Sequence, residues 1–252
     1  MAIVWGTARW RRRALGTAVA LAVLTVPTSA QDISIALGEG TTLTERAVQL
    51  IGLITVLSLA PSILVMMTSF TRIVVVLSLL RTAIGLQSAP PNAVMISLAL
   101  FLTAFIMQPT FEAAYEDGIQ PVIEGTIELD QGIERAVAPF HVFMRTQVRE
   151  EDVALFLDLA NQEAPATAEE LSLRILIPAF MISELRRAFE IGFLIYLPFV
   201  IIDMVVSSIL MAMGMMMMPP AVVSLPFKLI FFVLVDGWAL LAGSLVRSFG
   251  LS

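Results

Sequence analysis

The residue type with the clearest chemical potential is methionine, which is concentrated beside a Pro-Pro dipeptide in the last third of the chain. Thioether sulfur is a soft ligand that suits Cu(I), and the flexible methionine side chain can also repack around changing shapes. A Cu(I) site would usually add cysteine or histidine, and the apolar segments around the run contain neither. Three interpretations remain open: apolar filler, a deformable seal in a narrow pore, and a metal site. The run consists of Met211, Met213, Met215, Met216, Met217 and Met218.

Three charged residues, Asp203, Lys228 and Asp236, interrupt the apolar segments on either side of Pro219-Pro220. A charge at bilayer depth costs at least about 2.5–3.5 kcal/mol, so each is a candidate for function or for packing inside a protein complex. Lys228 lies about eight residues after the Pro-Pro turn and Asp203 about sixteen before it, which separates them by roughly 12 Å in a simple hairpin. Asp236, two turns further along, is again roughly 12 Å away. The sequence therefore predicts that Lys228 pairs with a neighbouring subunit or with carbonyls at a broken helix, unless it snorkels to water.

A second charged group precedes these apolar segments. Spacings of three and four place Glu184 beside Arg187, and Arg186 beside Glu190, on a shared helix face. Such pairs usually form a solvated face, but here they adjoin an apolar segment. A contact with another subunit is therefore the alternative interpretation.

The composition excludes most enzymatic sites. The chain has 252 residues, no cysteine and a single histidine, His141, so thiol chemistry and multi-histidine metal sites within one chain are ruled out. No nucleophile elbow and no P-loop are present. We therefore predict a non-enzymatic protein without a cofactor or a metal, and no basic face indicates nucleic-acid binding.

Hydropathy defines the elements that must position these residues. The chain is 58% hydrophobic and only 14% charged, which indicates an integral membrane protein. Four arginines, an apolar stretch and small residues at positions 28–30 predict a signal peptide over residues 1–30. A short segment (residues 31–46) precedes a first apolar helical hairpin (residues 47–111), with a kink at Pro61 and a helix expected from Pro90-Pro91 to near Pro109. An acidic, water-facing helical segment (residues 112–177) follows, and then a second apolar helical hairpin with the methionine-rich tip (residues 178–252).

The topology follows from the signal peptide and the charge distribution. A cleaved signal and two crossings would place residues 112–177 on the non-cytoplasmic side, with Arg72 and Arg81 facing the cytoplasm, as the positive-inside bias prefers. Helical spacing of Phe140, Phe143 and Phe156 predicts amphipathic helices rather than strands in this segment.

Several long motifs resemble one family of bacterial membrane proteins, the FliP family. They are residues 67–73 (MTSFTRI), 87–92 (QSAPPN), 183–193 (SELRRAFEIGF), 197–203 (LPFVIID), 211–217 (MAMGMMM) with Pro219-Pro220, 225–229 (LPFKL) and 235–238 (VDGW). The resemblance covers most of the chain from about residue 50 onward.

The resemblance implies an all-α fold, with integral membrane helical hairpins that assemble into a ring-shaped export gate of the flagellar basal body in the bacterial inner membrane. It implies a homo-oligomer, a pentamer in the family, with FliQ-like and FliR-like membrane proteins, an FlhB-like export-switch protein and unfolded export substrates as partners. It assigns the pore gasket to Met215, Met216 and Met217, with Met213 and Met218 beside them. Glu184, Arg187, Asp203, Lys228 and Asp236 are predicted to be buried or inter-subunit charges.

Two alternatives stay open at this stage. The first is a gate subunit of an injectisome, which uses the same core; the signal peptide and the long acidic segment favour the flagellum. The second is a small-molecule or metal transporter, which would bind an ion at the methionine run and would act without partner proteins.

Overall fold

The computed structural model describes residues 50–52, 54–55, 58, 62, 65–215 and 218–250. The predicted signal peptide (residues 1–30), the segment 31–46 and the kink expected at Pro61 lie outside this part of the chain. The chain divides into two units, residues 1–55 and 56–252, and all elements below belong to the second.

Every regular element among the described residues is a helix, which confirms the predicted all-α class. The elements are α3 (Phe70–Ile84), α4 (Asn92–Ala114), the π-helix η1 (Tyr115–Ile119), α5 (Gln120–Ile123), α6 (Leu129–Gln147), α7 (Glu150–Leu159), the 3-10 helix η2 (Ala168–Glu170), α8 (Leu173–Ala212), α9 (Pro220–Leu234) and α10 (Gly237–Arg247).

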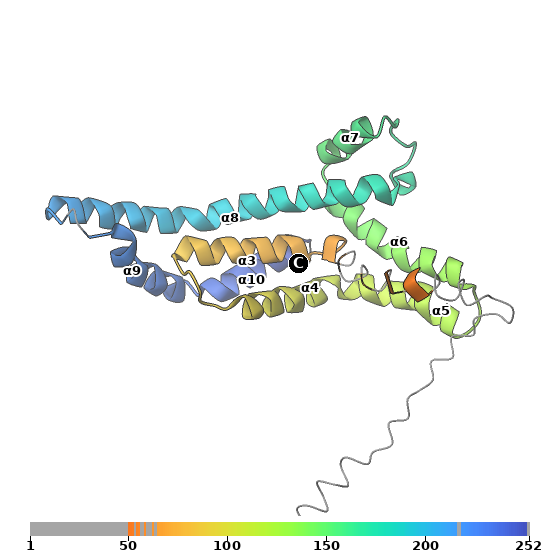
Figure 1. Cartoon of the computed structure of the whole chain (residues 1–252), viewed down its shortest axis with the longest axis horizontal. Coiled ribbons are helices and arrows are strands. Elements are labelled where there is room, and N and C mark those ends of the chain that lie inside the picture. Colours follow the sequence, from red (N-terminus) through yellow and green to blue (C-terminus); the bar gives the residue numbers. More distant parts are fainter. Residues whose placement is uncertain are drawn as a thin grey trace, which may run out of the picture. The chain divides into compact units, whose positions relative to one another are not determined.

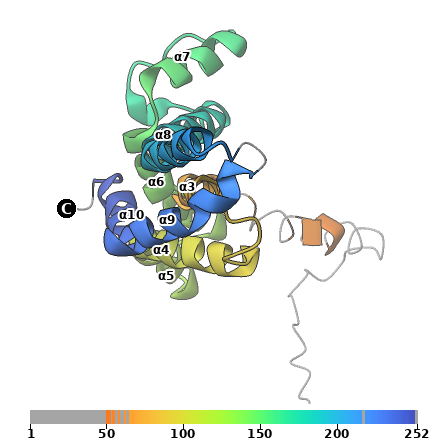
Figure 2. The same ribbon diagram turned by 90° about the vertical axis from the view of Figure 1, so that its left-hand side faces the viewer.

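The long helix α8 is the axis on which the other elements are arranged (Figure 1). Its 40 residues correspond to a length of about 60 Å at 1.5 Å per residue. α3 packs along its middle, and α4 covers the other side of α3 (Figures 1 and 2). The contact between α3 and α8 is close because α8 has Gly192 there: a Cβ at this position would lie 2.2 Å from Leu79 Cδ1. Ile73, Val76 and Ala188 are buried in the shared core.

A glycine lies just after the end of α3 and another just after the end of α8, and these two helix ends determine where the site residues lie. Gly85 follows α3 with φ +92°, and Gly214 follows α8 with φ +72°. In both, two backbone N–H groups bond back to the last turn, as in a Schellman motif: Gly214 N–H donates to Met211 O (3.0 Å) and Met215 N–H to Leu210 O (2.9 Å). α8 therefore stops at Ala212, well before Pro219-Pro220.

α4, η1 and α5 form one continuous helical stretch that packs against the antiparallel helix α6. Small residues bring the two backbones together: Gly118 faces Ala136, and Gly132 faces Val122. The helix begins at Asn92, directly after Pro90-Pro91, as predicted. The predicted end near Pro109 is wrong, because Pro109 lies inside α4 and the helical stretch continues to Ile123. A proline inside a helix costs about 3 kcal/mol, and burial of neighbouring apolar side chains such as Met107 offsets that cost.

The last apolar segment consists of two helices instead of one. α9 and α10 meet at an angle of 62°. The break is at Asp236, which has a left-handed backbone conformation (φ +50°, ψ +51°) and precedes the first residue of α10. A left-handed residue cannot continue a right-handed helix, so the chain turns there.

The acidic segment (residues 112–177) contains the end of α4, then η1, α5, α6, α7, η2 and the first turn of α8, which confirms helices over strands. Its apolar side chains Phe140, Met144 and Leu176 form a second core beside the first, together with Met107 of α4 and Phe180 of α8. The predicted boundary between the acidic segment and the second hairpin, at residues 177–178, falls inside α8 without a break in the helix.

Two helical stretches among the described residues are long and apolar enough to cross a membrane, residues 92–123 and 173–212. α9 and α10 would make a third, broken span if they cross together. Both long stretches exceed the roughly 20 residues that a span requires, so each would extend beyond the hydrocarbon layer if it crossed the membrane.

Candidate functional site: a methionine tip and two buried charge clusters

The methionines predicted to seal a pore lie at the tip where α8 turns into α9. Met213, Met215 and Met218 belong to the loop between these helices, and each is exposed by 42–59% of its surface. Met211, in the last turn of α8, is 58% exposed. The other two gasket candidates, Met216 and Met217, lie outside the described residues. The tip thus presents several flexible apolar side chains that the rest of the described chain does not cover.

Behind the tip, Lys228 of α9 pairs with Asp203 of α8 in the same chain. Lys228 Nζ lies 2.6 Å from Asp203 Oδ2 and donates a further hydrogen bond of 3.3 Å to the carbonyl of Ala83. Ser224, one turn before Lys228, donates to Asp203 Oδ1 at 2.6 Å. The Lys228 side chain is 7% exposed and that of Asp203 38%. The cluster therefore connects α8, α9 and the end of α3.

The prediction that Lys228 cannot reach Asp203 in its own chain is wrong, and the helix ends explain why. The prediction measured depth from Pro219-Pro220, but α8 ends at Ala212 and a loop precedes α9. Asp203 is nine positions before Ala212 (212 − 203) and Lys228 eight after Pro220 (228 − 220), so the two side chains lie at equal depth. The alternative partner, a carbonyl at a helix end, is present as well, because the last carbonyls of α3 have no intrahelical donor.

A second cluster surrounds Arg72, in the first turn of α3, whose side chain is 1% exposed. Its guanidinium forms a bidentate ion pair with Glu184 of α8, which is fully buried; the Nε–Oε2 distance is 2.8 Å. The same guanidinium donates to the carbonyl (3.1 Å) and hydroxyl (3.0 Å) oxygens of Ser248, and its Cζ lies 3.7 Å from the centroid of the Phe249 ring. Gln147, the last residue of α6, accepts a further hydrogen bond at 3.2 Å. Arg72 therefore holds α3, α6, α8 and the segment after α10 together.

The same polar region extends toward α7. Ser183, next to Glu184, donates to Asp152 Oδ2 at 2.6 Å and accepts from the backbone N–H of Arg149 at 3.1 Å. Arg186 Nη2 lies 3.9 Å from Asp152 Oδ1. These contacts fix the start of α7 on α8.

The charges predicted from helix spacing thus differ in their environments. Glu184 is buried, as expected, but its partner is Arg72, which lies 112 positions away in the sequence. Arg187 donates to Gln147 at 3.4 Å. Asp236 is exposed within the single chain and marks the break between α9 and α10, so an inter-subunit contact of this residue stays a prediction.

Sequence reasoning missed the role of Arg72. The available signal was an arginine next to an uninterrupted apolar run, a position where a long-range acidic partner is expected. Helix spacing could not identify that partner, because Glu184 already had a nearby arginine at three residues.

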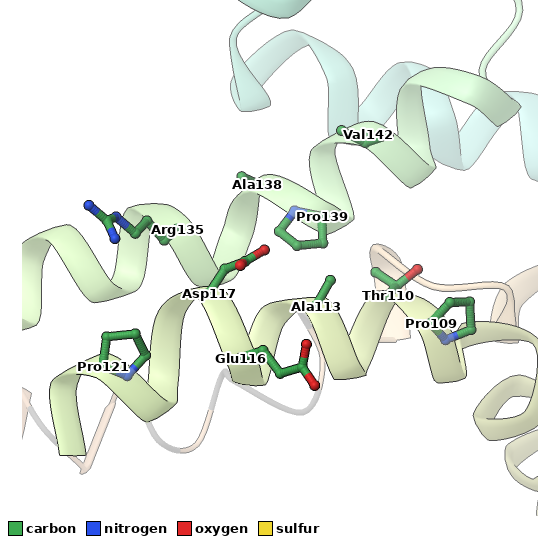
Figure 3. Close-up of a pocket in the computed structure, with 10 residues that line it drawn as sticks. All are labelled: Pro109, Thr110, Ala113, Glu116, Asp117, Pro121, Arg135, Ala138, Pro139 and Val142. Carbon is green, nitrogen blue, oxygen red and sulfur yellow. The ribbon is translucent and has the colours of Figure 1, made fainter. Parts of the chain in front are cut away.

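A groove of about 750 Å³ lies between the α4–α5 stretch and α6 (Figure 3). Pro109, Ala113, Asp117 and Pro121 line one side, and residues of α6 such as Arg135 and Pro139 line the other (Figure 3). The groove is wide and open to solvent.

No group of three histidine, cysteine, aspartate or glutamate residues with metal-binding geometry occurs in the described part of the chain. His141 Nε2 lies 2.7 Å from the carbonyl of Leu171, a contact that joins α6 to the loop before α8.

This combination of long apolar helices, ion pairs that join α8 to α3 and to α9, and an exposed methionine tip defines a helical integral membrane protein whose polar clusters hold its hairpins together. The chain belongs to the FliP family, whose pattern matches residues 53–245. It is 61% identical to the flagellar biosynthetic protein FliP of Caulobacter vibrioides over 92% of this chain and 88% of that protein. It is 52% identical to the protein of the same name from Bacillus subtilis (80% of this chain, 91% of that protein) and 52% identical to that of Agrobacterium fabrum (79% and 82%).

Proposed function

We propose that this chain is a core channel subunit of the flagellar protein-export apparatus, and that its methionine tip closes the channel at rest. The names of the relatives support the flagellar role, since the proteins that it resembles over most of its length are flagellar biosynthetic proteins. They also favour the flagellum over the injectisome. As a component of flagellum biogenesis and protein export, the chain would reside in the bacterial inner membrane with several crossings.

The gate role is inferred from one observation: the methionine tip is exposed at the end of the α8–α9 hairpin, and an ion pair joins these two helices. Met213, Met215 and Met218 project from a loop that the Asp203–Lys228 pair and the Gly214 ending hold between α8 and α9. Flexible thioether side chains on a rigid support can fill a narrow opening and still yield when an unfolded chain passes. Met216 and Met217 complete the proposed gasket by their place in the sequence.

A gate of this kind requires more than one copy. A single tip cannot enclose an opening, so we propose a ring of these chains, a pentamer as the family resemblance implies. FliQ-like and FliR-like proteins, an FlhB-like switch protein and the export substrates are its proposed partners. Much of the apolar surface of α8 is exposed, including Phe193, Ile201 and Met204, and such a ring would bury part of it.

The gasket is tested by replacing Met215, Met216 and Met217 together with alanine. Alanine is too short to fill the same opening, so we expect normal assembly with increased leakage of small ions through the resting channel. Met204→Ala is the matched control, because Met204 is an exposed methionine of α8 two turns before the tip. Unchanged ion permeability and unchanged export in the triple variant would exclude the gasket.

A further inference from the structure

Five exposed apolar side chains lie on the water-facing end of the α4–α6 hairpin. They are Tyr115, Ile119, Ile123, Leu129 and Ile133, with exposed fractions of 47–73%. We call them the hairpin patch. A contiguous apolar surface in a polar setting is typical of a docking site. Three patch residues lie at the end of the apolar stretch 92–123, but the roughly 20 residues that a span requires are already supplied by its uncharged part, residues 92–111, so a membrane crossing does not explain the patch.

The spacing of the residues shows that the patch lies on a single face. Along the α4–α5 stretch, Gly118 and Val122 face α6, and Asp117 and Pro121 line the groove of Figure 3. Each of these two pairs has a spacing of four residues and therefore lies on one side of the helix. The patch residues at positions 115, 119 and 123 have the same spacing and lie on another side, away from the groove.

The same arrangement holds for α6. Gly132 and Ala136 face the α4–α5 stretch, and Arg135 and Pro139 line the groove. Leu129 and Ile133, four residues apart, lie on the remaining side. Because the two helices are antiparallel, their non-groove sides form one surface that carries both apolar rows.

The charge around the patch identifies the kind of partner. Residues 112–135 contain seven acidic side chains and a single basic one, Arg135. All seven acids are exposed, but Glu116 and Asp117 line the groove, as Arg135 does. Of the other five, Glu124, Glu128, Asp130 and Glu134 are each adjacent in the sequence to a patch residue, and Glu112 lies three positions before Tyr115. An apolar strip with an acidic border is complementary to an amphipathic helix that has apolar residues on one face and lysine or arginine beside them.

We infer that the hairpin patch binds a basic amphipathic helix of another protein, which packs across the two apolar rows as a third helix against the α4–α5 stretch and α6. A second copy of the same patch is the wrong partner, because the two acidic borders would repel each other. A lipid surface is also disfavoured, because anionic headgroups repel acidic side chains. This inference is independent of the gasket and would stand if the methionine tip proved not to be a gate.

The test uses the full chain in zwitterionic lipid nanodiscs and two synthetic amphipathic helices, one of leucine and lysine and one of leucine and glutamate. We expect the lysine peptide to bind at least about tenfold more tightly than the glutamate peptide, and binding to weaken as salt is raised. Empty nanodiscs provide the background value.

Variants locate the binding to the patch. Ile123→Ser together with Ile133→Ser should weaken binding of the lysine peptide about tenfold, and the exposed positions make loss of the fold improbable as a cause. Val142→Ser is the matched control, since Val142 is 49% exposed and lines the groove on the opposite face, and it should bind as the unmodified chain does.

Cross-linking supplies a second, direct measurement. The chain has no cysteine, so a benzophenone label on Ile119→Cys or on the groove control Ala138→Cys is specific. We expect the lysine peptide to be captured from position 119 and not from position 138. Equal affinity for both peptides, no effect of the patch variants, or capture of lipid or of a second copy of the chain from position 119 would overturn the inference.

Discussion

At the scale of single residues, the pair of Arg72 and Glu184 is the most deeply buried ion pair among the described residues. Both side chains are almost completely buried, so neither charge has access to water once its partner is removed. We predict that Glu184→Gln lowers the free energy of unfolding by about 3–5 kcal/mol, because it leaves a buried guanidinium without a counter-charge. Thermal unfolding in detergent measures the change. Glu190→Gln, an exposed position on the same helix, should have almost no effect.

The pair of Asp203 and Lys228 should contribute less, because the Asp203 side chain is partly exposed. We expect Lys228→Met to lower the free energy of unfolding by about 1–3 kcal/mol, between the values of exposed and buried pairs. In the double variant with Asp203→Asn the two losses should not add, since each substitution already removes the same contact. Strictly additive losses would mean that the pair contributes nothing, and that Lys228 acts only through Ala83.

One exposed pair predicts a pH dependence. Arg145 donates a hydrogen bond to Glu169 and, with the Glu169 backbone N–H and the charge of Arg145, lowers the pKa of that carboxyl from its ordinary value of 4.5. A lowered pKa means that the contact stabilises the folded chain fully above pH 4.5 and is lost as the pH falls through the lower, folded-state value. Proteolysis of the loop before α8 should therefore increase at acidic pH in this window. In Arg145→Gln that increase should shrink, and an identical pH profile in both proteins would contradict it.

At the scale of helices, the glycine between α8 and α3 sets how closely they approach. A Cβ at Gly192 would lie 2.2 Å from Leu79 Cδ1 and 3.2 Å from Leu79 Cβ, so the helices would have to separate. We predict that Gly192→Ala lowers the free energy of unfolding by about 1–3 kcal/mol and that Leu79→Ala restores part of the loss. Gly243→Ala is the control: only the flexible end of Arg247 comes within 4 Å of its Cβ, and alanine favours helix there by up to about 1 kcal/mol. Equal effects at both glycines would exclude the close contact as the cause.

The helix starts could be read from the sequence more reliably than the helix ends. Pro90-Pro91 directly precedes α4, and Pro220 is the first residue of α9, because proline is accepted in the first turn and excluded from most later positions. The end of α8 was missed because Gly214, the residue that terminates it, lies inside the methionine run and the Pro-Pro dipeptide was the stronger local signal. That single error of helix length produced the wrong partner for Lys228.

For the charge clusters, the sequence identified the important residues but could not predict their partners. Position in an apolar segment was enough to identify Glu184, Asp203 and Lys228 as residues of interest, since charges there are costly. Their partners depend on which helices pack together, and helix packing is not encoded in the spacing within one helix. Arg72 and Glu184 meet only because α3 packs on the middle of α8.

At the scale of the whole molecule, the length of α8 has a consequence for assembly. Exposed apolar side chains occur on it from Ile182 to Met211, a range of 30 of its 40 residues. Thirty residues of α-helix extend over about 45 Å, whereas the hydrocarbon layer is about 30 Å thick. Even with tilt, a bilayer would leave part of this surface in water, so neighbouring protein is the remaining way to cover it.

We therefore predict that lipid reaches only part of the exposed face of α8 in the assembled protein. Because the chain has no cysteine, single cysteines with a fluorescent label can be placed along one face of the helix, for example at Ile182, Phe189, Phe193 and Met204, and tested with lipid-borne and water-soluble quenchers. We expect one continuous set of positions to be quenched from the lipid and at least one position to be protected from both quenchers, because a neighbouring subunit covers it. Dissociation of the complex should make the protected positions accessible. If every position were quenched from the lipid in the assembled state, α8 would lie wholly in the bilayer, and the ring would have to be held together by other helices.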